Sequence, residues 1–215
     1  MAQSPTYSKK GFGQQFRRKS EIKEPGVYLI ACEGTRDEPR YIQEFVKEMR
    51  VRAKVFIAER EAGDYGSNPR QVYDILKVNM EKPTFSTRKE SVHGWIMVDR
   101  DNDRMEELKE VKEQCDDTGV SIAYSSPCIE LWFLLHYTDL SSLNIDDPEK
   151  LLISKRMKAY LKDNHFDPAK GFLEILPLTN EAIDRAREID DPDVDFPEDF
   201  CTRVYKLVQE LLEFD

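Results

Sequence analysis

The segment GWIMVDRDNDRME (94–106) places three aspartates at alternate positions directly after an apolar run. These acids are Asp99, Asp101 and Asp103, and carboxylates this close repel one another unless a cation compensates them. A further acid, Glu33, directly follows another apolar run. Carboxylate oxygens without His or Cys select a hard ion such as Mg²⁺ or Mn²⁺. If the two runs form neighbouring strands, Glu33, Asp99 and Asp101 are expected to converge on a metal ion.

The aspartates could also have a different role. Asp103, or Asn102, could cap a helix that begins near Arg104. A calcium-binding EF-hand loop starting at Asp99 would need Gly where Arg104 stands. A phosphatase of the D-x-D-x-T kind would carry Thr or Val in place of Asp103. No P-loop and no G-x-G-x-x-G motif occurs in the chain, so a glycine-rich phosphate cradle is not indicated.

The elements that must position these acids follow from the hydrophobic pattern. Short apolar runs bounded by turn residues are typical of strands buried on both faces of a parallel sheet. They lie at 27–32, 53–59, 93–99 and 120–126. Segments with helical spacing follow them, at 39–50, 68–81, 104–119 and 127–137. This alternation predicts an α/β fold in which a parallel sheet is flanked by helices. Ligands bind at the carboxyl ends of such strands.

The chain divides into three predicted parts. Residues 1–24 form a basic N-terminal arm, which could reach a polyanion or could be a solvated tail. Residues 25–140 form the α/β core that carries the candidate acids, and residues 141–215 form a helical C-terminal extension. Its helices are predicted at 147–164, 180–190 and 197–214.

Composition limits the class of protein. The chain has 215 residues, of which 40% are hydrophobic and 34% charged, as expected of a folded globular protein. The net charge of −10 argues against coating nucleic acid by bulk electrostatics. No apolar stretch is long enough to span a membrane, and the N-terminus does not read as a signal peptide. Four cysteines without C-x-x-C spacing suit a reducing cytoplasm.

Three motifs carry a family resemblance. They are ACEGTRDEPRYIQEF (31–45), MVDRDND (97–103) and SSPCIELWFLLHY (125–137). In this order and spacing they resemble the RloB-like family, a Toprim-type group associated with bacterial restriction and phage-defence loci. The Toprim pattern is a Glu in a glycine-bearing turn after the first strand, followed by D-x-D after a later strand. Two positions depart from the family pattern, because Asp37 stands where Thr is usual and Ser126 where Asn is usual.

The resemblance implies a Toprim-like core and roles for individual residues. Glu33 would be a general acid/base or metal ligand, and Asp99 and Asp101 would hold Mg²⁺ or Mn²⁺. Additional candidates are Asp103, Glu38 and Glu130. Glu38 and Glu130 could instead be ordinary first-turn acids, which the helix dipole stabilises.

Basic residues near the predicted site are candidates for phosphate binding, although they could simply balance the charge of the acids. They are Arg40, Arg100 and Arg104.

The implied activity is metal-dependent cleavage of phosphodiester bonds in DNA or RNA, tRNA included, in abortive infection against phage. The alternative is a non-catalytic effector module bound to a separate ATPase sensor. Its interface would be the apolar segment IELWFLLHY (129–137) and the acidic segment 184–199.

Overall fold

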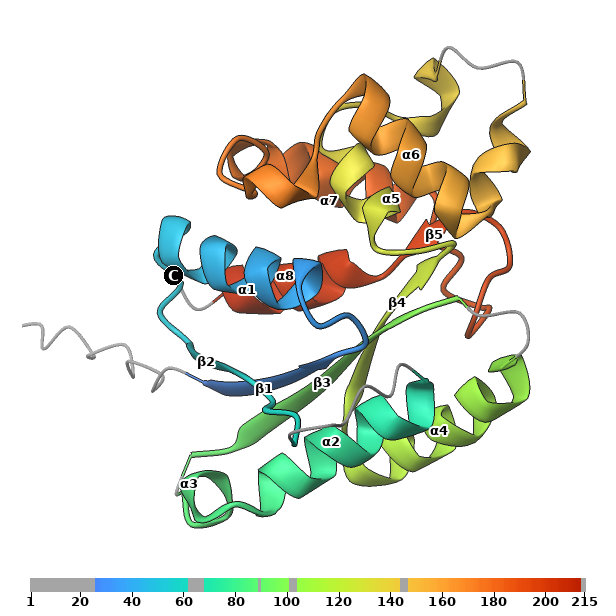
Figure 1. Cartoon of the computed structure of the whole chain (residues 1–215). Coiled ribbons are helices and arrows are strands. Elements are labelled where there is room, and N and C mark those ends of the chain that lie inside the picture. The colour runs from blue at the N-terminus through green and yellow to red at the C-terminus, as the bar shows by residue number, and fades with distance from the viewer. Residues whose placement is uncertain (1–25, 62–67, 89, 101–103, 144–146, 214–215) are drawn as a thin grey trace, which may run out of the picture.

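The computed structural model describes residues 26–61, 68–88, 90–100, 104–143 and 147–213. One sheet has the strand order β2-β1-β3-β4-β5 (Figure 1). Its strands are β1 (Val27–Cys32), β2 (Lys54–Ile57), β3 (Val92–Asp99), β4 (Ser121–Ser126) and β5 (Cys201–Thr202). The first four pair in parallel, and β5 pairs antiparallel with β4. The predicted parallel sheet flanked by helices is confirmed, with an antiparallel strand added at one edge.

The helices form layers on both faces of the sheet and at one end of it (Figure 1). Their bounds are α1 Asp37–Glu48, α2 Pro69–Glu81, α3 Pro83–Ser86, α4 Met105–Thr118, α5 Glu130–Leu135, α6 Ser154–Asn164, α7 Thr179–Glu188 and α8 Val204–Leu212. α1 and α8 cover one face of the sheet, and α2 and α4 cover the other. α5, α6 and α7 gather near the carboxyl ends of the strands, so the C-terminal part is helical, as predicted.

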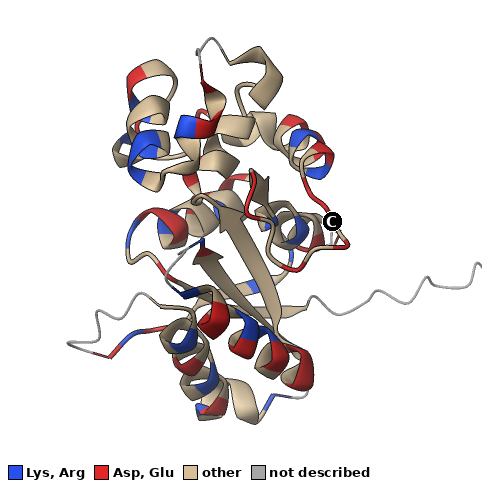
Figure 2. Ribbon diagram, turned by 90° about the vertical axis from the view of Figure 1, so that its right-hand side faces the viewer, with Lys and Arg blue, Asp and Glu red and all other residues tan. Residues whose placement is uncertain are grey.

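The two faces of β1 show why the sheet is buried on both sides. Alternate residues of a strand point to opposite faces. Val27 and Leu29 belong to the core beneath α2 and α4, whereas Tyr28 and Ile30 belong to the core beneath α1 and α8. All are buried, so a continuous apolar run is required here. Charged residues lie mainly on helices and loops, and the strands carry few of them (Figure 2).

Local signals define the helices between the strands. The Asn68 side chain accepts a hydrogen bond from the Gln71 backbone N–H at 2.8 Å, and Pro69 occupies the first position of α2. Gly119 ends α4 with φ of +69°, a conformation that favours glycine. These boundaries agree with the sequence-based expectation.

Two predictions about the later elements were wrong. The segment predicted as one helix over 197–214 contains β5, and α8 starts only at Val204. The edge of β4 explains this difference, because Ser125 and Thr202 pair there and their hydroxyl groups lie 3.0 Å apart. The apolar segment 129–137 is no partner surface, since its helix α5 is buried in the core.

The four cysteines are buried free thiols. No helix in the described part of the chain is both long and apolar enough to cross a membrane.

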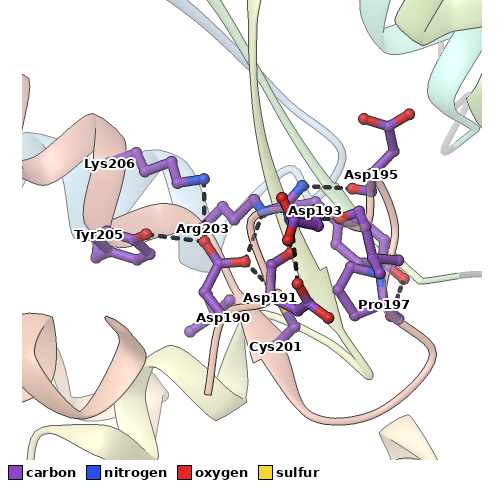
Figure 3. Close-up of polar contacts among 12 residues, drawn as sticks. Asp190, Asp191, Asp193, Asp195, Pro197, Cys201, Arg203, Tyr205 and Lys206 are labelled. Atoms are coloured by element: carbon purple, nitrogen blue, oxygen red, sulfur yellow. Dashed lines mark hydrogen bonds and ion pairs between the residues drawn. The ribbon is translucent and has the colours of Figure 1, made fainter. Parts of the chain in front are cut away.

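Arg203 organises the acidic segment that precedes β5 (Figure 3). Its Nε donates to Asp190 Oδ1 at 2.9 Å. Its Nη2 donates to the carbonyl oxygens of Asp191 and Val194 at 2.9 and 2.6 Å, and its Nη1 donates to that of Asp195. One guanidinium group therefore satisfies several carbonyl groups of a turn that lacks regular secondary structure.

Asp190 is the buried partner of this arginine, with a side chain only 3% exposed. It also accepts from the Tyr205 hydroxyl at 2.8 Å and lies 3.0 Å from Lys206 Nζ (Figure 3). Although burial opposes its charge, hydrogen bonds from Arg203, Lys206 and Tyr205 lower the pKa of Asp190. This part of the acidic segment is thus built into the core.

Replacing Arg203 with Met is expected to lower the free energy of unfolding by about 3–5 kcal/mol, because it removes one partner of a buried ion pair and orphans three carbonyl groups. Urea unfolding followed by circular dichroism measures the change. The matched control is Arg187→Met, whose ion pair with Asp184 is exposed, and it should change stability by less than about 1 kcal/mol. Equal effects of the two substitutions would contradict the role assigned to Arg203.

Candidate functional site

Glu33 and Asp99 meet at the carboxyl ends of two neighbouring strands. β1 and β3 are paired so that Cys32 lies opposite Met97, which brings the residues after both strands to one edge. The Glu33 backbone N–H donates to the Met97 carbonyl oxygen at 2.9 Å. In return, the Asp99 backbone N–H donates to Glu33 Oε2 at 2.9 Å. The structure therefore brings together two of the three residues predicted as metal ligands.

The Asp99 side chain extends this connection to the next strand. Asp99 Oδ1 accepts a hydrogen bond at 2.9 Å from the backbone N–H of Ile129, the residue before α5. α5 follows β4 through the cis peptide bond between Ser126 and Pro127. A single carboxylate thus joins the end of β3 to the start of the helix after β4.

Glu38 approaches the same edge from the first turn of α1. Its side chain is buried, and its Oε1 accepts from the Gly34 backbone N–H at 2.9 Å. A Cβ atom on Gly34 would lie only 1.9 Å from Glu38 Oε2, so any larger residue would displace this carboxylate. Glycine after β1 therefore lets the Glu38 carboxylate lie directly against the backbone.

Glu130 is the first residue of α5, and it is buried. Its Oε1 lies 3.6 Å from Nζ of Lys158 on α6. Its Oε2 is buried and has no hydrogen-bond partner among the described residues. Lys158 was not among the residues predicted for the site, because it lies well after Glu130 in a segment expected to be a separate extension.

These residues line one cavity of about 250 Å³. Its charged lining consists of Glu33, Arg36, Asp37, Glu38, Asp99, Glu130 and Lys158. The acids outnumber the bases, so the cavity has an excess of negative charge when its acids are ionised.

The electrostatics of the cavity follow from this crowding. Desolvation, with the nearby charges of Glu38, Glu130 and Glu33, raises the pKa of Asp99 well above its usual range. Burial raises the pKa of Glu38 as well, although hydrogen bonds from backbone N–H groups oppose the shift. Desolvation disfavours the Lys158 ammonium group, but the surrounding acids outweigh it and raise the pKa of Lys158.

The donor set suits a hard cation. The cavity offers carboxylate oxygens. A bound cation would be a partner for the buried Glu130 Oε2, which has no hydrogen bond among the described residues. No three His, Cys, Asp or Glu side chains are grouped as a metal site within the described ranges. Asp101 and Asp103 lie outside the described residues, so their predicted roles as a metal ligand and an additional acid stay predictions.

The three arginines predicted for phosphate binding do not line the cavity. Arg40 is 2.7 Å from Glu44 Oε1 and donates to the Ala169 carbonyl oxygen at 3.1 Å. Arg100 pairs with Glu198 at 3.2 Å and has a largely buried side chain. Arg104 directly precedes α4. The cations that line the cavity are Arg36 and Lys158 instead.

Gly34→Ala is expected to lower the free energy of unfolding by about 1–3 kcal/mol, because the added methyl group overlaps the Glu38 carboxylate. Urea unfolding of the two single variants and of Gly34→Ala/Glu38→Ala measures the coupling. Removing the Glu38 side chain should make the alanine at position 34 nearly neutral. Additive effects in this double-mutant cycle would show that a side chain at position 34 does not overlap the Glu38 carboxylate.

Comparison with known proteins gives one match. A family model described as RloB-like protein matches residues 28–211, which is most of the chain. No curated protein and no solved structure matched the chain. The matched region runs from β1 into α8 and therefore includes the cavity, β5 and the C-terminal helices. The resemblance expected from three short motifs is thus confirmed over a longer region, and the chain belongs to the RloB-like family.

Proposed function

We propose that this protein is a metal-dependent nuclease that cleaves phosphodiester bonds of DNA or RNA. The observation that carries the proposal is the convergence of Glu33, Glu38, Asp99 and Glu130 on one cavity at the carboxyl ends of the strands. Carboxylates held this close repel one another, and a bound cation would offset that repulsion. Glu33 and Asp99 also occupy the positions that the Toprim pattern reserves for its acids.

Glu33, Asp99 and Asp101 would hold Mg²⁺ or Mn²⁺. The bound ion would supply charge that screens the phosphate and lowers the pKa of a water molecule. Backbone hydrogen bonds orient the acids, because Glu33 Oε2 and Asp99 Oδ1 each accept from an N–H group. Glu38 or Glu33 could take a proton from an attacking water, and burial raises the pKa of Glu38, which makes its carboxylate a stronger base.

The biological setting is proposed from the family. RloB-like proteins resemble Toprim-type nucleases of bacterial restriction and phage-defence loci. Cleavage of a shared cellular nucleic acid such as tRNA would stop growth and produce abortive infection. A separate ATPase partner would then control when the activity is released.

Replacing Asp99 with Asn, or Glu33 with Gln, is expected to lower Mg²⁺-dependent cleavage by about 10²–10³-fold. Both substitutions keep a hydrogen-bond acceptor and remove one negative charge from the cavity. The assay incubates purified protein with labelled DNA and with total tRNA, in Mg²⁺, Mn²⁺ or EDTA. Calorimetric titration with Mn²⁺ measures the metal site independently, and Asp101→Asn should abolish its binding.

The control variants remove exposed acids of α4 by the same chemistry, Asp117→Asn and Glu113→Gln, and should cleave like the wild type. Full activity in both site variants would contradict the proposal. A wild-type protein that neither cleaves these substrates nor binds Mn²⁺ would favour the non-catalytic module.

Asp99→Asn is also expected to stabilise the metal-free fold at neutral pH. The native pKa of Asp99 is raised, so the native state binds a proton that the unfolded state releases above about pH 4. Wild-type stability therefore falls as pH rises from about 4 through the native pKa of Asp99. The uncharged Asn avoids this loss and can still accept from the Ile129 N–H.

Thermal unfolding in EDTA between about pH 4 and 8 measures the effect. Asp99→Asn should exceed the wild type by about 1 kcal/mol, or about 2–4 °C in Tm, at the upper end of this range. The difference should shrink towards pH 4, where the wild-type carboxyl is protonated in the native state and about half protonated in the unfolded state. A lower Tm for Asp99→Asn at pH 8 would show that charge crowding is not the dominant effect.

A further inference from the structure

α6 differs in charge from the rest of this acidic protein. It carries Lys155, Arg156, Lys158 and Lys162 against a single acid, Asp163. Among the α-helices of the described residues, it alone has more basic than acidic side chains. Figure 2 shows basic residues on the helices above the sheet, near the carboxyl ends of its strands.

The basic residues of α6 lie on its outer side. Spacings of three and four residues place Lys155, Lys158 and Lys162 along one stripe of the helix surface. All three are exposed, whereas Met157 and Leu161 are buried and attach another side of α6 to the core. We call Lys155, Lys158 and Lys162, with the adjacent exposed Arg156, the basic stripe.

The basic stripe reaches the carboxylate cavity through Lys158. The Lys158 side chain lines the cavity and lies 3.6 Å from Glu130, yet it remains 54% exposed. The first turn of α6 is attached beside the cavity, because the Ser154 hydroxyl donates to the Pro127 carbonyl oxygen at 3.1 Å. Lys158, the middle lysine of the stripe, therefore lies both at the protein surface and at the edge of the cavity that holds the acids.

The cations of the stripe are available to an incoming anion. Lys155 and Arg156 form no ion pair with any residue that the structure describes. Lys162 lies 3.7 Å from Asp167, and a pair with an exposed lysine contributes little and is readily exchanged. The stripe spans about 10 Å along α6, which is about three phosphates of one nucleic-acid strand.

We propose that the basic stripe binds the sugar-phosphate backbone of a nucleic acid and places one phosphate beside Lys158, at the mouth of the cavity. The inference rests on the proposed nuclease function and names the surface that holds its substrate. The physical reason is that a cavity lined by carboxylates repels a polyanion. Adjacent cations must offset that repulsion before a phosphate can approach the acids.

The test measures binding without cleavage. Fluorescence anisotropy follows the binding of labelled single-stranded DNA, duplex DNA and an RNA hairpin in EDTA, over a series of salt concentrations. The variant Lys155→Gln/Arg156→Gln/Lys162→Gln should bind at least about 10-fold more weakly at low salt. The slope of log K against log salt should fall by about 2–3, since each lost phosphate contact lowers it by about 0.7–0.9.

Two control variants make this result specific. Lys47→Gln/Lys77→Gln/Lys109→Gln removes the same charge from exposed positions on α1, α2 and α4, and should leave the slope unchanged. Lys155→Arg/Arg156→Lys/Lys162→Arg keeps the charge of the stripe and should bind like the wild type. This second control separates the loss of charge from damage to α6.

Equal slopes for the stripe variant and the α1, α2 and α4 variant would overturn the inference. Binding of the wild type to polyglutamate as tightly as to RNA of equal charge would also overturn it, in favour of an acidic protein partner. Because EDTA prevents metal-dependent cleavage, neither outcome decides whether the protein is a nuclease. The cleavage assay with Asp99→Asn decides that separately.

Discussion

Two hydrogen bonds between backbone N–H groups and carboxylates hold the carboxyl ends of three strands together. The Asp99 N–H donates a hydrogen bond to the Glu33 carboxylate, and the Ile129 N–H donates one to the Asp99 carboxylate. These two bonds connect the end of β1 to the end of β3, and the end of β3 to the start of the helix after β4. A third bond of the same kind holds Glu38 to Gly34. Ionised carboxylates can only accept hydrogen bonds, and acids that repel one another need donors from outside their own group. The backbone supplies these donors and thereby fixes where the charge collects.

The C-terminal segment completes both the fold and the cavity. β5 extends the sheet beyond β4, and α8 covers the same face of the sheet as α1. Lys158 of α6 supplies a cation to a cavity whose acids come from the first 130 residues. Its ion pair with Glu130 is half-exposed and therefore contributes modestly to stability. The position of Lys158 matters more than the strength of this pair. Lys158 places a positive charge beside the carboxylates that raise the pKa of Asp99.

The acidic segment before β5 has two different parts. The Asp190 side chain is buried against Arg203, Tyr205 and Lys206. Its charge therefore stabilises the turn and does not form part of an exposed acidic surface. Other acids nearby, such as Asp191 and Asp193, are exposed. A count of charges along the sequence treats these residues alike, although one is part of the core and the others face solvent.

The alternation of apolar runs and amphipathic segments was enough to predict the four parallel strands and the helices between them. This succeeds because the period of burial is a local property of the chain, and the caps at Asn68 and Gly119 are local as well. The same pattern placed Glu33 and Asp99 at strand ends, since parallel strands end at a common edge. Three motifs also indicated the RloB-like family, to which the chain belongs.

Tertiary structure alone decided which cations accompany these acids. The sequence suggested Arg40, Arg100 and Arg104 by proximity along the chain, but the cavity is lined by Arg36 and Lys158. Tertiary structure likewise decided that the apolar helix α5 is buried and that β5 interrupts a segment with helical character. Each depends on contacts between residues far apart in sequence, such as Glu130 with Lys158 or Ser125 with Thr202. Periodicity reports the burial of a residue but not the identity of its neighbour, so the sequence by itself determined the strands and the acids at their ends, and packing determined their partners.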